Sequence, residues 1–349
     1  MKTIRWIKLY ITIPIILITI IFSFNFIIDP YSITSYNLLN ISNKFARDDR
    51  KEKVAKLYIE KRYDNMLFGS SHVYSINPLV VQKYLGGRTY NAGVGTARIE
   101  DQLGFLLYLE HINKLPKNII LGLDFYSFNQ NIETNKYFLL NDDLNFLQQR
   151  ANSDLYFSKF LSLDAIRASY KTFKNFLKDS TDKPRFDNYG TAGNASSIFT
   201  YYPKNIKNKH FEKTQVEDGY QAIKTIKYIN ISKNRLQYIK DITLLCKKYH
   251  INYTFFITPL NGQLIDKIEN DSQLNITLKK FKEELAYITP YYDFIRHNKI
   301  NDNRAFFGGD TMHTTTSTGN LILARLFNDK NISLPKNFGV CVPKREVQP

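Results

Sequence analysis

The chain has 349 residues, of which 43% are hydrophobic and 14% aromatic, and these fractions exclude a wholly disordered protein. Lys and Arg number 48 against 32 Asp and Glu, and the resulting net charge of +16 suits a protein that works beside an anionic surface or polymer. The two cysteines, Cys246 and Cys341, are too few for a disulfide scaffold and lack the spacing of a metal site. The length allows about two average domains, or one large domain with an insertion.

The segment 9–28 contains no charged residue, and its length matches the roughly 20 residues that an α-helix needs to cross a bilayer. Lys2, Arg5 and Lys8 precede it, so the positive-inside rule places the N-terminus in the cytoplasm and the rest of the chain outside. A cleaved signal peptide is the alternative, but its apolar region is usually shorter and ends in small residues. We therefore expect a retained, single-pass anchor in the cell membrane.

Past a polar stalk, short apolar runs alternate with amphipathic stretches. The apolar runs predict strands at 65–68, 89–92, 118–123, 251–257 and 291–295. Asn77 as an N-cap and Pro78 at the first helical position predict the start of a helix. Helices are expected at 78–85, 99–112, 219–249, 274–286 and 317–327. This alternation favours an α/β fold, a doubly wound parallel sheet of about five strands with helices on its faces.

From 126 to 217 the alternation dissolves, and we interpret this stretch as a long helical insertion. The expected segments are a cytoplasmic tail (1–8), a transmembrane helix (9–28), a juxtamembrane stalk (29–63), a first part of the α/β domain (64–125), the insertion (126–217), a second part of the domain (218–328) and a C-terminal tail (329–349). A basic excess over 201–250 indicates either a solvated helix face or attraction to anionic lipid headgroups or an acidic glycan. Nucleic acid is not an expected partner, because no recognition motif accompanies the charge.

Gly-Ser-Ser-His at 69–72 directly follows the first predicted strand. In open α/β sheets, ligands bind beyond the carboxyl ends of the strands, so a serine here is well placed to react. By itself, however, such a serine pair is more often a turn or a helix cap than a nucleophile.

Asp-Thr-Met-His at 310–313 supplies the residue types that a serine nucleophile requires. A neutral imidazole near pH 7 takes the serine proton, and a carboxylate three residues earlier can hold its second ring N–H. The loop at 90–96, Tyr-Asn-Ala-Gly-Val-Gly-Thr, has glycines that let backbone N–H groups face a developing oxyanion. A dinucleotide site is not expected there, because Gly-x-Gly-x-x-Gly is incomplete. We predict no cofactor and no metal.

In this order, the three blocks resemble those of the SGNH (GDSL-like) hydrolase and acyltransferase superfamily. The resemblance implies a flavodoxin-like sheet, with Ser71 as the nucleophile, His313 as the base and Asp310 as the residue that orients it. It also implies that the backbone N–H groups of Ser71, Gly95 and Thr96 bind the oxyanion. The likeness covers the two predicted parts of the α/β domain and neither the anchor nor the insertion.

Two positions depart from the family pattern. Ser70 stands where the family usually has Asp, which leaves open which serine attacks. The family's third block, Gly-x-Asn-Asp, is Gly-Leu-Asp-Phe at 122–125, and an ionised Asp124 cannot donate to an oxyanion and would repel it. The third donor is therefore missing, replaced, or supplied by a residue such as Asn129. His72 is assigned no role.

Such departures, together with one N-terminal span, resemble envelope proteins that assist polymer acylation, namely the D-alanyl-lipoteichoic acid transfer and alginate O-acetyltransferase-like groups. These imply a multi-pass membrane acyltransferase as partner. The sequence thus predicts a membrane-anchored serine O-acyltransferase that acts on an envelope polysaccharide or teichoic-acid-like polymer through an acyl group on Ser71. A carbohydrate esterase or deacetylase of the same fold, and a non-catalytic scaffold that binds a glycan or a membrane partner, are the alternatives.

Overall fold

The computed structural model describes residues 2–30, 38–39, 41, 50, 53–54, 56–57, 60–133, 160–178, 189–191, 209–224 and 230–346. The chain forms two compact units, of which the first contains Met1–Lys61 and Asn141–Arg185 and the second contains Arg62–Leu140 and Phe186–Pro349. The predicted insertion over 126–217 is thus divided between the two units. Most of this insertion and most of the predicted stalk over 29–63 lie outside the described residues.

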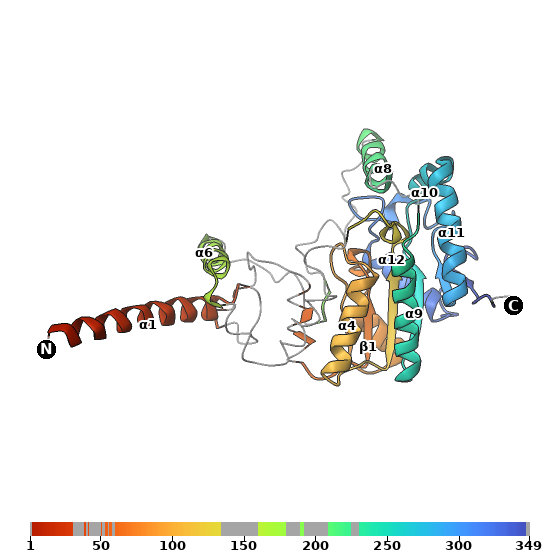
Figure 1. Ribbon diagram of the computed structural model, residues 1–349. Helices are drawn as coiled ribbons and strands as arrows, with labels where there is room; N and C mark the ends of the chain where they lie inside the picture. The colour runs from red at the N-terminus through yellow and green to blue at the C-terminus, as the bar shows by residue number, and fades with distance from the viewer. Residues whose placement is uncertain are drawn as a thin grey trace. The chain divides into compact units, whose positions relative to one another are not determined.

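The first unit contains α1 (Lys2–Ile28) and α6 (Leu163–Lys178), both visible in Figure 1. Within α1, Trp6–Ile28 is long and apolar enough to cross a membrane, with a mean hydropathy of 2.5. The end of this helix packs on α6 and the residues before it, since the rings of Phe24 and Phe173 meet edge to face and Asn25 donates a hydrogen bond to the Phe160 carbonyl. The predicted apolar helix is confirmed, whereas its orientation in a membrane stays a prediction.

The second unit is built on a six-stranded sheet in the order β2-β1-β3-β4-β5-β6. Its strands are β1 (Asn65–Phe68), β2 (Thr89–Asn91), β3 (Asn118–Leu123), β4 (Asn252–Ile257), β5 (Tyr291–Asp293) and β6 (Val340–Val342). The first five strands are parallel, which confirms the predicted α/β sheet, and β6 adds an antiparallel edge that the sequence did not predict. The three residues of β6 are partly exposed, and their pattern is too short to predict a strand.

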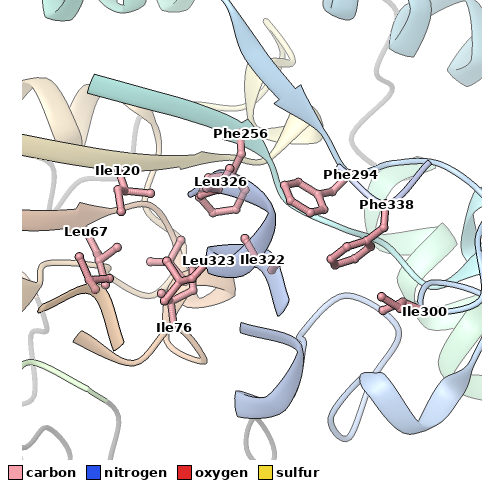
Figure 2. Packing of buried hydrophobic residues seen from close by; sticks show 12 residues of the cluster. Leu67, Ile76, Ile120, Phe256, Phe294, Ile300, Ile322, Leu323, Leu326 and Phe338 are labelled. Carbon is pink, nitrogen blue, oxygen red and sulfur yellow. The ribbon is translucent and has the colours of Figure 1, made fainter. Parts of the chain in front are cut away.

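Helices cover both faces of the sheet. The helices of this unit are α3 (Pro78–Leu85), α4 (Ile99–His111), α8 (Lys209–Lys224), α9 (Lys233–Lys248), α10 (Gly262–Asn270), α11 (Ser272–Ile288) and α12 (Thr316–Leu326), of which α8 packs on α10. Figure 1 shows α4 and α9 side by side along one face, where Phe68 of β1 contacts Phe105 of α4. On the other face, Leu67, Ile120 and Phe256 of the strands pack with residues of α12 (Figure 2). Neighbouring residues of a strand therefore serve opposite faces, as the pleat requires.

The single helix predicted over 219–249 is wrong, because α8 and α9 are separate helices. Before α9, Ile231 forms an antiparallel bridge with Asn129, and the N–H of Ser232 donates to the Phe128 carbonyl at 2.7 Å. The side chain of Ser232 then accepts the N–H of Arg235 and caps the new helix. A pairing with a segment about a hundred residues earlier thus interrupts a locally helical pattern.

The two cysteines are both free. Cys246 is buried in α9, and burial raises the pKa of its thiol to about 12, so the thiol stays protonated and unreactive at neutral pH. Cys341 lies exposed on β6. These two residues therefore form no disulfide with each other.

Val73 packs among glycines at the carboxyl ends of three strands. It belongs to the short 3₁₀ helix η1 (Ser71–Val73), which follows β1. A Cβ would lie 2.6 Å from a Val73 methyl at Gly69, 2.4 Å at Gly93 and 2.7 Å at Gly122, distances that real Cβ atoms do not show. Gly69 also has φ +150°, a conformation that other residues rarely adopt. The absence of side chains at these positions lets η1 lie directly on the strand ends.

We expect Gly93→Ala to lower the free energy of unfolding by about 1–3 kcal/mol, because the added methyl overpacks the site of Val73. The φ of Gly93 is not positive, so backbone strain does not account for the loss. Urea unfolding measures it, and Val73→Ala provides the matched control. The double variant Gly93→Ala/Val73→Ala should lose less unfolding free energy than the sum of the losses in the two single variants. Additive losses would contradict this explanation by packing.

Candidate active site

Ser71 stands at the start of η1, beyond the carboxyl end of β1. Its Oγ lies 2.8 Å from Nε2 of His313, a residue 242 positions away in the sequence. Ser70 instead caps η1, since its Oγ accepts the N–H of His72 at 3.2 Å and is buried beside the His72 ring. The geometry therefore favours Ser71 over Ser70 as the serine that faces a base.

Close packing holds η1 and the histidine loop together. The buried side chain of Asn91, at the end of β2, donates to the carbonyls of Val73 and Ile76. Ser75 Oγ lies 2.7 Å from the hydroxyl of Thr314, which follows the candidate base directly. At Gly319 of α12, a Cβ would lie only 2.4 Å from the Ser75 carbonyl oxygen. The start of α12 thus packs on the segment after η1, and this contact brings the turn that carries Ser71 close to the loop that carries His313.

Asp310 has two roles in the loop before α12. Its Oδ1 accepts the N–H groups of Met312 and His313 at 2.8 and 2.7 Å, while its Oδ2 lies 2.6 Å from Nδ1 of His313. The loop is closed by a bridge between Phe307 and Thr314. The same carboxylate therefore caps the turn and holds the imidazole through Nδ1.

The electrostatics of these groups suit proton transfer from a hydroxyl. Burial opposes the charge of Asp310, but hydrogen bonds from the His313 ring and from two backbone N–H groups outweigh it and hold the pKa of Asp310 well below its ordinary value. Burial lowers the pKa of His313, and the neighbouring His72 lowers it further against the opposing effect of Asp310. A neutral His313 that donates Nδ1–H to Asp310 can accept the hydroxyl proton of Ser71 at the lone pair of Nε2.

A second cluster of polar side chains, centred on His72 and Asp124, lies next to His313. The sequence analysis assigned it no function. Nδ1 of His72 is 2.8 Å from Oδ1 of Asp124, and Thr258 donates to the same oxygen at 2.7 Å. The hydroxyl of Tyr126 lies 3.0 Å from Nδ1 of His72. The ring of His72 is stacked at a tilt on that of His313, with centroids 4.3 Å apart. Only the position of His72 next to Ser71 and of Asp124 after β3 hinted at this group in the sequence.

The carboxylate of Asp124 is buried and accepts hydrogen bonds from His72 and Thr258. Its negative charge, which was expected to repel an oxyanion, is therefore bound by these two side chains. Burial would raise the pKa of Asp124, but the charge and hydrogen bond of His72 outweigh it and lower the pKa. Asn129, the suggested substitute donor, uses its Oδ1 to accept the N–H of Asn131 in a turn. This contact does not involve the Nδ2 donor, so a role of Asn129 as the third donor stays a prediction.

The glycine-containing loop after β2 packs on the turn that carries the serine. The N–H of Val94 donates to the Gly69 carbonyl at 3.1 Å, and the hydroxyl of Thr96 donates to the Gly95 carbonyl at 2.7 Å. Thr96 has φ +55°, in the left-handed region. The loop that carries Gly95 and Thr96 is thus tied through Val94 to Gly69, in the turn before Ser71, while the role of Gly95 and Thr96 as oxyanion donors stays a prediction.

The described part of the chain contains no group of three or more His, Cys, Asp or Glu residues arranged for a metal ion. In comparisons with known proteins, the sequence matches no family model and no curated protein. The likeness to the SGNH superfamily therefore stays a prediction.

The two stacked histidines should titrate on opposite sides of the ordinary histidine pKa of 6.5. Burial and His72 lower the pKa of His313, whereas Asp124 raises that of His72 against the effect of burial. Nitrogen NMR of histidine-labelled full-length protein measures both values, and His72→Gln and His313→Gln assign the signals. The reverse order would contradict this account of the charges.

Proposed function

We propose that the protein is a serine-dependent acyltransferase of the SGNH type, which moves an ester-linked acyl group on a cell-envelope glycan. The observation that supports this is the hydrogen-bonded series from Ser71 Oγ through both ring nitrogens of His313 to Asp310, at the carboxyl end of a parallel sheet. A nucleophile, a base and a residue that orients the base, each within hydrogen-bond reach of the next, are what covalent acyl transfer requires.

In the proposed reaction, Oγ of Ser71 forms a bond to the acyl carbonyl carbon while its proton passes to Nε2 of His313. The bond from this carbon to the leaving oxygen then breaks, and His313 returns the proton to that oxygen. Asp310 stays ionised throughout and stabilises the imidazolium. In the second half, a sugar hydroxyl forms a bond to the acyl carbon while its proton passes to Nε2 of His313; the bond from this carbon to Ser71 Oγ then breaks, and His313 returns the proton to Oγ. Backbone N–H groups at Ser71, Gly95 and Thr96 hold the oxyanion of each half.

The proposed setting is the outer surface of the cell membrane. An apolar helix within α1 is long enough to anchor the chain, and a net charge of +16 favours an anionic partner such as a teichoic-acid-like polymer or an acidic polysaccharide. The proposed source of the acyl group is a multi-pass membrane acyltransferase. Water in place of the sugar hydroxyl would make the same site an esterase, and a turnover assay in which polymer and water compete separates these acceptors.

A fluorophosphonate probe tests the nucleophile, because it phosphonylates a serine that is activated by a base. We expect the full-length protein to be labelled and Ser71→Ala to lose the labelling completely while keeping its circular dichroism spectrum. Ser70→Ala is the matched control and should still be labelled, since Ser70 Oγ caps η1 and is not the group bonded to His313. An intact protein that takes no label would support a non-catalytic scaffold instead.

Asp310→Asn tests the orientation of the base. The introduced amide oxygen can still accept the two backbone N–H groups, but its NH₂ group faces Nδ1 of His313 and reverses the tautomer. Nε2 then carries a proton and cannot accept that of Ser71. We expect the labelling rate to fall about 10⁴-fold with the fold retained, as in other triads of this kind. A loss of less than about tenfold would show that Asp310 only caps the turn.

A further inference from the structure

The His72–Asp124 pair is enclosed by protein directly behind the candidate base. The side chains of His72 and Asp124 are 5% and 4% exposed, and their nearest atoms are 2.8 Å apart. Thr258, which follows β4, donates a second hydrogen bond to the carboxylate. The pair therefore links η1 to the ends of the two central strands β3 and β4.

The surroundings of His72 favour its protonated form. Its neighbours Asp124 and Tyr126 follow β3, and Asp310 and His313 come from the loop before α12. Burial raises the pKa of Tyr126 well above its ordinary value, so the phenol is neutral, and both carboxylates are negative because their pKa values are lowered. A buried carboxylate without a counter-charge is costly, and the imidazolium of His72 supplies that charge to Asp124.

The protonated ring of His72 acts on His313 across a ring distance of 4.3 Å. Two imidazolium ions this close repel each other, and the interior around them screens the repulsion less than water does. His313 is the ring with the hydroxyl of Ser71 on one nitrogen and Asp310 on the other. During acylation, the proton of Ser71 therefore passes to a ring whose protonated form is destabilised by the charge of His72.

We infer that the His72–Asp124 pair is a positioning unit for the base: it holds a buried positive charge against the ring of His313 and so keeps that ring in the neutral form that accepts the proton of Ser71. The inference rests on the proposed function, in which His313 is the base. His72 keeps its own proton throughout, while the proton of Ser71 passes to His313 and on to the leaving oxygen. The same repulsion makes the protonated His313 a stronger acid toward that oxygen.

The test is the pH profile of fluorophosphonate labelling, measured on the full-length protein in detergent. For the wild type, the acid midpoint should lie below the ordinary value of 6.5. In His72→Gln the repelling charge is gone, so the midpoint should move up by about one pH unit. At pH values below both midpoints, the rate relative to the plateau should then fall about tenfold.

His72→Gln combined with Asp124→Asn removes both charges and keeps two hydrogen-bonding side chains, which protects the fold from an unpaired buried carboxylate. Its midpoint should still move up, because the effect of His72 on the pKa of His313 exceeds the opposing effect of Asp124. The move should be smaller than in His72→Gln, because the effect of Asp124, which raises this pKa, is lost as well. Tyr126→Phe changes no charge and is the control, with an expected midpoint equal to that of the wild type.

The outcomes separate the two proposals. A wild-type protein that is not labelled at any pH refutes the proposed function, and this inference with it. Labelling with an unchanged acid midpoint in the variants, at whatever plateau, shows that the pair has only a structural role and overturns the inference alone. The wild-type profile is informative even if neither variant folds, since an acid midpoint at or above 6.5 also overturns it.

Discussion

The packing of Val73 against three glycines is the constraint on which the site depends. Those glycines lie at the ends of the three neighbouring strands β1, β2 and β3, so no side chain separates η1 from the sheet. On its other side, the segment after η1 meets α12 through Ser75 and Gly319, again with no space for a further carbon atom. Closely packed interiors transmit small displacements, and contact on both sides therefore sets the distance from Ser71 to His313.

Two carboxylates and two imidazoles share the resulting site, and their surroundings shift the pKa values of the two imidazoles in opposite directions. Asp310 bonds to His313, whose pKa is lowered, while Asp124 bonds to His72, whose pKa is raised. Asp124, the direct partner of His72, raises the pKa of that imidazole against the effect of burial, whereas burial and then the charge of His72 lower the pKa of His313. Such divergence between neighbouring groups of one kind is how a protein assigns them different tasks.

Elements that depend on local signals were predictable from the sequence. The strand at 118–123 and the start of α3 at Pro78 agree residue for residue, because an apolar run and an Asn-Pro cap express their preferences without distant partners. The prediction failed where a distant segment intervenes. Pairing between Asn129 and Ile231 separates α8 from α9, and β6 exists only because β5 offers an edge to pair with.

The sequence by itself determined an apolar N-terminal helix and an α/β sheet, because residue type, spacing and periodicity carry that information locally. Its resemblance to the SGNH superfamily pointed to Ser71, Asp310 and His313 as the residues to examine. Only the tertiary structure decided which serine faces the base and what neutralises Asp124. Those answers depend on contacts between residues that are 242 and 52 positions apart in the sequence. They also depend on burial, which strengthens the electrostatic interactions between these residues. Neither the contacts nor the burial exists until the strands have brought their carboxyl ends to one edge of the sheet.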